Sequence, residues 1–291
     1  MIYYLLLVAS IVLAVCKSSL YNSYAKGGEL TLFSIFRFHA VSYGVAAVIS
    51  LGGVLIASQK ISTATVICAF FYAVIVIGLQ TSSILAMQVG TMSTTSIFVM
   101  YGMIIPSIAG PIFWNEPIGV LQIVGMLMML ASLWLMQERS MGEKKSITKK
   151  WLALATVAFL FSGMAGVMEK IHQSTEARSE QLSFVFAACG FMLLFSLSAM
   201  GIIRRLRAEK AARSTASIAF LSGLVVGLYS TVNLMLAGGL DSMIYYPIAN
   251  GGAMLLTVLV SAVLFKERFS RMKIIGVIIG FAGILCLSIP V

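Results

Sequence analysis

Long apolar runs alternate with short polar breaks along the whole of this 291-residue chain. A membrane-spanning helix needs roughly 20 mostly apolar residues to cross the hydrocarbon core of a bilayer. Strict apolar–polar alternation over about ten residues, which is typical of a transmembrane β-barrel, is absent. We therefore predict an all-α integral membrane protein with ten transmembrane helices, at residues 2–22, 31–57, 62–87, 91–113, 118–136, 151–171, 182–203, 215–238, 242–264 and 272–290.

Two stretches of the chain, residues 85–136 and 236–287, share one layout. Each has an apolar run, a short break with a single glutamate, and a second run with a glycine nine residues after that glutamate. At an offset of 151 positions, nine of the 52 residues are identical, including the glutamates Glu116 and Glu267. About five identities are expected by chance in so apolar a composition, so the shared layout is the stronger observation. An internal repeat of this kind is typical of a pseudo-symmetric transporter.

The longest polar connection, residues 137–150, divides the chain into a first repeat at 1–140 and a second repeat at 141–291. Each half contains five predicted helices. Because five is odd, the second half enters the membrane from the side opposite to the first. The prediction is therefore two inverted five-helix repeats, related by an axis in the membrane plane.

The composition also indicates a membrane protein. The chain is 60% hydrophobic and 10% charged, with a mean hydropathy of +1.01, whereas soluble proteins carry about 25% charged residues. Its net charge of +10 comes from short basic clusters between apolar runs, not from a basic face that would bind nucleic acid. We expect a multi-pass protein of the cell membrane (the plasma or inner membrane), with the lipid bilayer as a partner and no nucleic acid.

The basic residues are distributed unequally between the two sides of the predicted bundle. When each connection is numbered by the helix that precedes it, the odd-numbered connections and their flanks hold fifteen Lys and Arg residues, and the even-numbered ones hold three. Lys and Arg are enriched in cytoplasmic connections. The charge distribution therefore predicts odd-numbered connections in the cytoplasm and both termini outside.

The four cysteines stand alone in apolar runs, without the spacing of a disulfide framework or a metal site. We expect them to be packing residues, and we expect no metal ion and no cofactor. The start of the chain has no basic region and no small-residue cleavage site, so the first run is expected to be a retained helix, not a signal peptide.

The segments around the two glutamates resemble the signature of the EamA-like family of the drug/metabolite transporter superfamily. In that signature an apolar run leads to Phe-x-Glu-x-hydrophobic-Ser, and a glycine-containing helix follows. Residues 264–270 read Leu-Phe-Lys-Glu-Arg-Phe-Ser, and Gly276 and Gly280 follow. The first copy departs from the signature at Pro117 and Gly119. The resemblance covers essentially the whole chain, but members of this family typically place both termini in the cytoplasm, in disagreement with the charge distribution.

The resemblance implies a secondary transporter that moves a small organic solute or metabolite by alternating access. It implies a central cavity lined by helices one, three, four, six, eight and nine, with helices five and ten at the periphery or at a dimer contact. Export is the expected direction, with or without coupling to protons, and uptake by the same fold is the alternative.

A membrane-embedded enzyme is the rival from another class. HExxH, GxSxG and a P-loop are all absent, and the chain has only two histidines, His39 and His172. We therefore predict that the protein is not an enzyme.

Ionisable residues inside the predicted helices are functional candidates, because a charge at the bilayer centre costs at least about 2.5 kcal/mol. Lys17 is either a cavity cation or an anchor whose charge reaches the membrane surface. Glu169 is the best candidate for a carboxylate that takes up a proton, and a solvated helix end is the alternative. His39 is a second candidate for proton coupling. Lys170 holds a position in the second half similar to that of Lys17, which favours a cavity role for it.

Neutral polar residues inside the helices are the candidates for solute recognition. A pocket with an apolar body and a few polar groups is typical of a small-molecule site, whereas hydrogen bonds between helices and an interfacial aromatic belt are the alternative. The candidates are Gln80, Thr94, Thr95, Tyr229, Asn233, Tyr245, Tyr246 and Asn250.

Two further features have structural interpretations. Glu116 and Glu267 are expected to bind amides at the start of the helix that follows each of them. Gly276 and Gly280 form a GxxxG pattern, which serves either packing within one chain or a dimer face. A monomer and a homodimer are both open.

Overall fold

The computed structural model describes residues 2–26, 30–89, 95, 98–136, 148–206, 216–265, 271–287 and 289. Within these ranges the chain forms ten α-helices and two short 3₁₀ helices, with no β-strand. The elements are α1 (Ile2–Lys26), α2 (Leu32–Ala57), α3 (Thr63–Val89), η1 (Tyr101–Met103), α5 (Ile104–Trp114), α6 (Val120–Met136), α7 (Lys149–Gln173), η2 (Glu176–Ser179), α8 (Gln181–Leu206), α9 (Ala216–Gly239), α10 (Ser242–Phe265) and α11 (Arg271–Leu287).

The prediction of an all-helical chain with ten helices is confirmed for the described residues, because each predicted span overlaps one of these helices. The fourth span, predicted at 91–113, is described only from residue 98 onward, apart from Thr95. There it is helical throughout, with α-helical residues 98–100 followed by η1 and α5. Proline at position 111 lies inside α5.

Local sequence explains several helix ends. Thr31 caps α2, where its side chain accepts a hydrogen bond from the Ser34 amide at 3.2 Å and the Ser34 side chain accepts one from the Thr31 amide at 3.0 Å. Thr148 caps α7 by accepting from the Trp151 amide at 3.1 Å. Asn115 ends α5 in the left-handed conformation, with φ of 52°, which asparagine adopts more readily than most residues.

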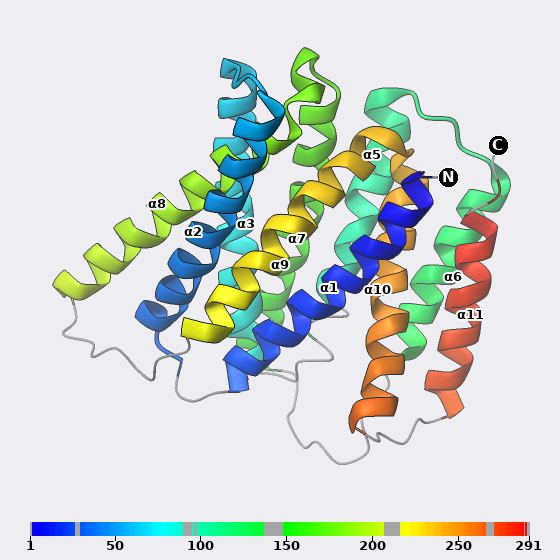
Figure 1. Ribbon diagram of the computed structural model, residues 1–291. Coiled ribbons are helices and arrows are strands. Elements are labelled where there is room, and N and C mark those ends of the chain that lie inside the picture. Colours follow the sequence, from blue (N-terminus) through cyan, green and yellow to red (C-terminus); the bar gives the residue numbers. More distant parts are fainter. Residues whose placement is uncertain are drawn as a thin grey trace.

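The helices pack in pairs that join the first half of the chain to the second (Figure 1). α2 packs against α8, α3 against α7, α1 against α9, and α6 against α11 at the edge of the bundle. α1 begins and α11 ends at the same end of the bundle (Figure 1). Of the apolar cores that result, the two largest are built mainly from α2, α3, α7 and α8, and mainly from α1 and α10 with α6 and α11.

α6 and α11 approach each other closely at glycines. A Cβ on Gly125 would lie 2.9 Å from the backbone oxygen of Gly283, and a Cβ on Gly283 would lie 3.0 Å from that of Gly125. The Ser132 hydroxyl donates a hydrogen bond to the Gly276 carbonyl at 2.8 Å. Small residues allow this backbone approach. The glycine face of α11 therefore packs within the chain, which confirms the first interpretation of the GxxxG pattern.

Six helices, α1, α2, α3, α7, α8 and α9, are long and apolar enough to cross a membrane. Large apolar side chains cover the outside of the bundle, for example Ile56 at 90%, Val120 at 77% and Phe113 at 73% exposure. Water-soluble proteins rarely expose contiguous apolar surface on this scale, whereas lipid accepts it. The fold therefore supports a multi-pass membrane protein.

Candidate functional site

A cavity of about 190 Å³ lies between the two apolar cores and is lined by residues from both halves of the chain. Its wall comes from α1, α3, the segment from Val99 to Pro106, α7, α9 and α10, with Tyr43 of α2 and Met192 of α8. These include all six helices that the family resemblance implied. No described residue of α6 or α11 lines the cavity, in agreement with the peripheral position expected for helices five and ten.

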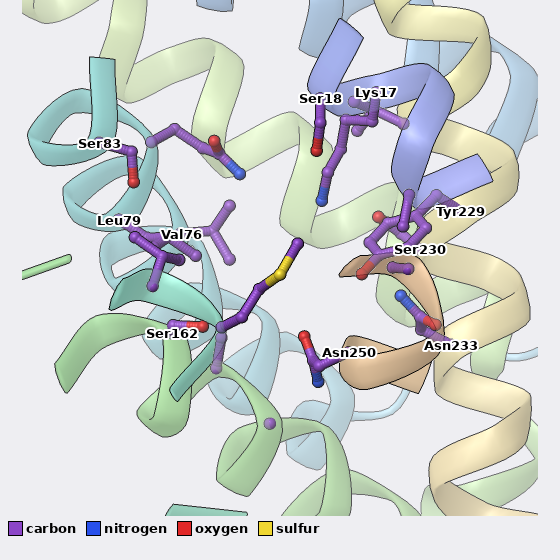
Figure 2. A pocket seen from close by; sticks show the side chains of 18 of the residues that line it. Lys17, Ser18, Val76, Leu79, Ser83, Ser162, Tyr229, Ser230, Asn233 and Asn250 are labelled. Carbon is purple, nitrogen blue, oxygen red and sulfur yellow. The ribbon is translucent and has the colours of Figure 1, made fainter. Parts of the chain in front are cut away.

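Most of the residues selected from the sequence meet in this cavity. The lining includes the two charged candidates Lys17 and Glu169 and six neutral candidates, namely Gln80, Tyr229, Asn233, Tyr245, Tyr246 and Asn250. Figure 2 shows Tyr229, Ser230 and Asn233 of α9 along one wall, Val76, Leu79 and Ser83 of α3 along the opposite wall, and Asn250 between them.

Among the described lining residues, the cavity has one carboxylate and one ammonium group. Glu169 on α7 is 8% exposed, and its Oε1 accepts a hydrogen bond from the Tyr72 hydroxyl of α3 at 3.0 Å. Lys17 on α1 extends into the cavity (Figure 2), with its Nζ 3.8 Å from the centre of the Tyr229 ring. This distance suits a cation–π contact. The two charges attract each other, but no ion pair joins them in the described part of the chain.

Two of the neutral candidates that line the cavity, Asn233 and Tyr246, also bind neighbouring helices. Asn233 accepts a hydrogen bond from the Ser10 hydroxyl of α1 at 2.6 Å. The Tyr246 hydroxyl donates to the Gly166 carbonyl of α7 at 2.5 Å, and the Asn250 amide donates to the Tyr246 carbonyl one turn earlier at 2.9 Å. Hydrogen bonding between helices and formation of a pocket are therefore compatible here. These bonds fix the orientation of the side chains that face the cavity.

Three selected residues do not contribute to the described cavity wall. Thr94 lies outside the described residues. Thr95 is buried and accepts a hydrogen bond from the Trp151 indole at 2.9 Å. His39 is fully buried on α2, where its ring stacks on Tyr43 with 5.6 Å between centroids. Tyr43 lines the cavity and His39 does not, so the imidazole lies behind the wall.

Several lining residues were not found from the sequence. Tyr72 is the most important, because it is the hydrogen-bond partner of Glu169. Tyr72 could have been selected from the sequence, because a tyrosine in the middle of an apolar helix needs a hydrogen-bond partner for its hydroxyl when it is buried. Met100, Met103 and Met192 gave no such signal, because apolar residues facing a cavity and apolar residues facing lipid have the same sequence pattern.

On the side of the even-numbered connections, here called the even side, an ion pair joins the two halves. Glu116, between α5 and α6, pairs with Lys170 near the end of α7, with 2.5 Å between Oε1 and Nζ. The other oxygen of Glu116 accepts a hydrogen bond from the Ser242 amide at the start of α10, at 2.7 Å. Lys170 also donates to the Leu240 carbonyl at 3.4 Å. The two charged side chains are only 13% and 6% exposed.

This pair corrects two predictions. Lys170 does not line the cavity, and the similarity of its position to that of Lys17 is therefore misleading. Glu116 binds the amide of α10, not that of the helix that follows it. At the start of α6 it is Gln122 whose side-chain oxygen accepts from the Gly119 amide, at 3.1 Å. Glu267, the second-half counterpart of Glu116, lies outside the described residues.

A second polar cluster joins the halves on the even side. The Glu180 carboxylate accepts hydrogen bonds from the Ser62 amide at 2.8 Å, the Ser62 hydroxyl at 2.9 Å and the Thr65 hydroxyl at 2.6 Å. The Thr65 hydroxyl also lies 3.2 Å from Nε2 of His172. Burial acts in the opposite direction, but these hydrogen bonds hold the pKa of Glu180 below its usual value.

Comparisons with known proteins bear on the fold alone. No family model matches the chain. No curated protein matches it either. A solved structure described as "Crystal structure of protein" is similar with a TM-score of 0.74 and 12% sequence identity, over 98% of this chain and 96% of that one. The arrangement of helices is therefore one that an experimentally determined protein also adopts over nearly its whole length.

Proposed function

We propose that this protein is a secondary transporter of the drug/metabolite transporter superfamily, similar to its EamA-like members. It moves a small organic solute across the cytoplasmic membrane by alternating access, and export is the expected direction. The observation that carries this proposal is the cavity between the halves, where polar and charged side chains meet inside helices that are otherwise apolar. A charge is costly inside a bilayer, so its presence there favours a functional site.

The packing of the helices supports an inverted repeat. When the ten α-helices are counted in chain order and each is replaced by the helix five places later, the pair α3–α7 becomes the pair α9–α1. Both pairs are in contact. The same replacement turns α2–α8 into α8–α2 and α6–α11 into α11–α6, so each of these two observed pairs is its own counterpart. At the level of residues, an offset of 151 relates the Ser132–Gly276 contact to the Gly283–Gly125 contact. Both relations are expected of two halves around a pseudo-two-fold axis, the arrangement that lets a transporter interchange its open sides.

The dimensions and chemistry of the cavity indicate the class of cargo. Its volume of about 190 Å³ is smaller than the roughly 300–1,000 Å³ of pockets for drug-sized ligands. Tyrosine rings and methionines supply an apolar body, while Gln80, Asn233 and Asn250 supply amide groups. The proposed cargo is therefore a small, partly apolar metabolite with a polar end.

Glu169 is proposed to link transport to protons. It is the carboxyl group of the cavity, and Tyr72 and Lys17 are neighbours that stabilise its charged form. A group that binds a proton in one state and releases it in the other ties the cargo to the proton gradient. His39, which lies behind the cavity wall, is not needed for this role.

The test is counterflow in proteoliposomes. A thermal-shift screen of metabolites on the purified protein first identifies a ligand, because a bound ligand stabilises the native state. Counterflow of that ligand should then require the protein, and Asn250→Ala should slow it more than Ile278→Ala, a change on the exposed face of α11. An enzyme or a scaffold would show no protein-dependent exchange, and that result would reject the proposal.

A further inference from the structure

The two sides of the bundle differ in how the halves are joined. On the even side the Glu116–Lys170 ion pair and the Glu180 cluster connect the first half to the second. On the opposite, odd side the described residues include the hydrogen bond from Trp151 to Thr95, but no ion pair between the halves. Within the described residues, ion pairs between the two halves are therefore found on the even side alone.

On α1 and α3 the cavity extends toward the odd side, whereas on α7 and α10 it extends toward the even side. On α3 its lining runs from Tyr72 to Met87, close to the odd end of the helix at Val89, while the nine residues before Tyr72 do not contribute. On α1 the lining runs from Ala14 to Tyr21, in the half nearer the odd side. On α7 and α10 the lining reaches Glu169, which directly precedes Lys170, and Tyr245, three residues after Ser242. The ion pair therefore lies at the even end of the cavity.

Glu116 holds together the two helices that would have to part there. It binds Lys170 at the end of α7 and both the amide and the hydroxyl of Ser242 at the start of α10. α7 and α10 also carry Glu169 and Asn250 of the cavity wall. Since Lys170 follows Glu169 directly in the chain, a movement that separates Lys170 from Glu116 also moves the cavity carboxylate.

An ion pair suits a contact that must open to water and close again. Separating it loses the attraction between the charges, but each charge regains its hydration, so the two terms largely offset each other. Opening an apolar contact of similar size has no such compensation. The neighbouring Asp241 belongs to the same cluster, where burial and the charge of Glu116 raise its pKa while Lys170 opposes them.

We propose that the Glu116–Lys170 ion pair, together with Ser242, is the latch that closes the even side of the cavity, and that it separates whenever the cavity opens on that side. This proposal rests on the transport function proposed above. It assigns a gating role to three residues that lie outside the solute site.

The test measures access to the cavity from each side, without knowledge of the cargo. Ser230→Cys is introduced as a cavity reporter after replacement of Cys16, Cys68, Cys189 and Cys286. Lys60→Cys, at an exposed position between α2 and α3, identifies the even side. An impermeant maleimide is then applied to sealed vesicles of each orientation. In the otherwise unchanged protein, Ser230→Cys should react rapidly from the odd side and slowly from the even side.

Removing one charge of the latch should open the even side. With Glu116→Gln or Lys170→Met, even-side labelling of Ser230→Cys should rise by roughly 5- to 150-fold, the usual range for coupling between sites. Lys170→Arg keeps the charge and is the matched control, with labelling close to that of the unchanged protein. If the Glu116→Gln variant folds, by its thermal unfolding, and labels like the unchanged protein, the latch proposal is overturned.

A cross-link tests the latch where the charge variants do not fold. Ile118→Cys and Ser174→Cys place exposed thiols on the two halves beside the latch, on an otherwise intact ion pair. Joining them with a bifunctional reagent should stop the slow even-side labelling at position 230, and continued labelling would overturn the proposal. Labelling of the uncross-linked protein from one side only, at all times, would count against alternating access itself. The two failures are therefore distinguishable.

Discussion

Two lysines at similar positions in the two halves of the chain occupy opposite environments. Lys170 lies on the even side, paired with Glu116 and bonded to the Leu240 carbonyl. Lys17 extends into the cavity, where it contacts the face of Tyr229 and has no ion-pair partner in the described part of the chain. A charge with a fixed counter-charge holds the structure together. A positive charge that has only an aromatic face and a more distant carboxylate beside it remains available to bind a solute.

The first prediction tests the cavity side of this comparison and has the largest expected effect. Glu169→Gln should abolish the response of net flux to a pH gradient, because an amide cannot bind and release a proton, while exchange at equal pH continues. The measurement is uptake of the identified solute into proteoliposomes with and without the gradient. Glu176→Gln, on an exposed turn, is the control. A full response in Glu169→Gln would remove Glu169 from proton coupling.

The second prediction compares the lysines directly. Lys170→Met leaves Glu116 buried without its counter-charge, and loss of one partner of a buried pair costs about 3 kcal/mol of unfolding free energy. Lys17→Met removes a cation–π contact worth about 1 kcal/mol. Denaturant unfolding in detergent measures both. Equal losses would show that the distinction between a structural and an available lysine is wrong.

The third prediction concerns the neutral wall of the cavity. Asn250→Ala and Tyr229→Phe should each weaken binding of the identified solute by up to about tenfold, since each removes a hydrogen-bonding group worth about 1 kcal/mol. Titration calorimetry gives the affinity, and unfolding should be nearly unchanged. Ser174→Ala, at an exposed helix end, is the control. Parent-like transport by both variants would show that the cavity has been assigned to the wrong residues.

The smallest expected effect concerns the Glu180 cluster. Because the pKa of Glu180 is held below its usual value in the folded protein, its hydrogen bonds contribute stability above the unfolded value of about 4.3. This contribution should disappear as the pH falls through the lower, folded value. Thermal unfolding between about pH 3 and 6 should therefore show a smaller acid-dependent loss in Glu180→Gln than in the parent protein. Identical pH profiles would show that the cluster contributes nothing measurable.

The positions of the helices were determined by the sequence itself. Each helix is specified by its own apolar run, since lipid requires the backbone to satisfy its hydrogen bonds within the segment. For this reason all ten spans could be placed from local composition, whereas the peripheral position of α6 and α11 was implied only by the family resemblance. Glu169, Lys17 and Asn250 could be selected for the same reason, because a polar group in such a run is conspicuous wherever it points.

Which charge meets which partner was decided only by the tertiary structure. Glu116 and Ser242 are 126 positions apart in the chain, and Tyr72 and Glu169 are 97 apart. No pattern in the neighbouring sequence indicates that Glu116 binds the start of α10 instead of α6. Nor does any such pattern indicate that Lys170 pairs with a carboxylate while Lys17 contacts a tyrosine ring. Such contacts depend on how whole helices of the two halves are placed against each other. In an apolar chain that placement follows from close packing at small residues such as Gly125 and Gly283, not from any pattern along one helix.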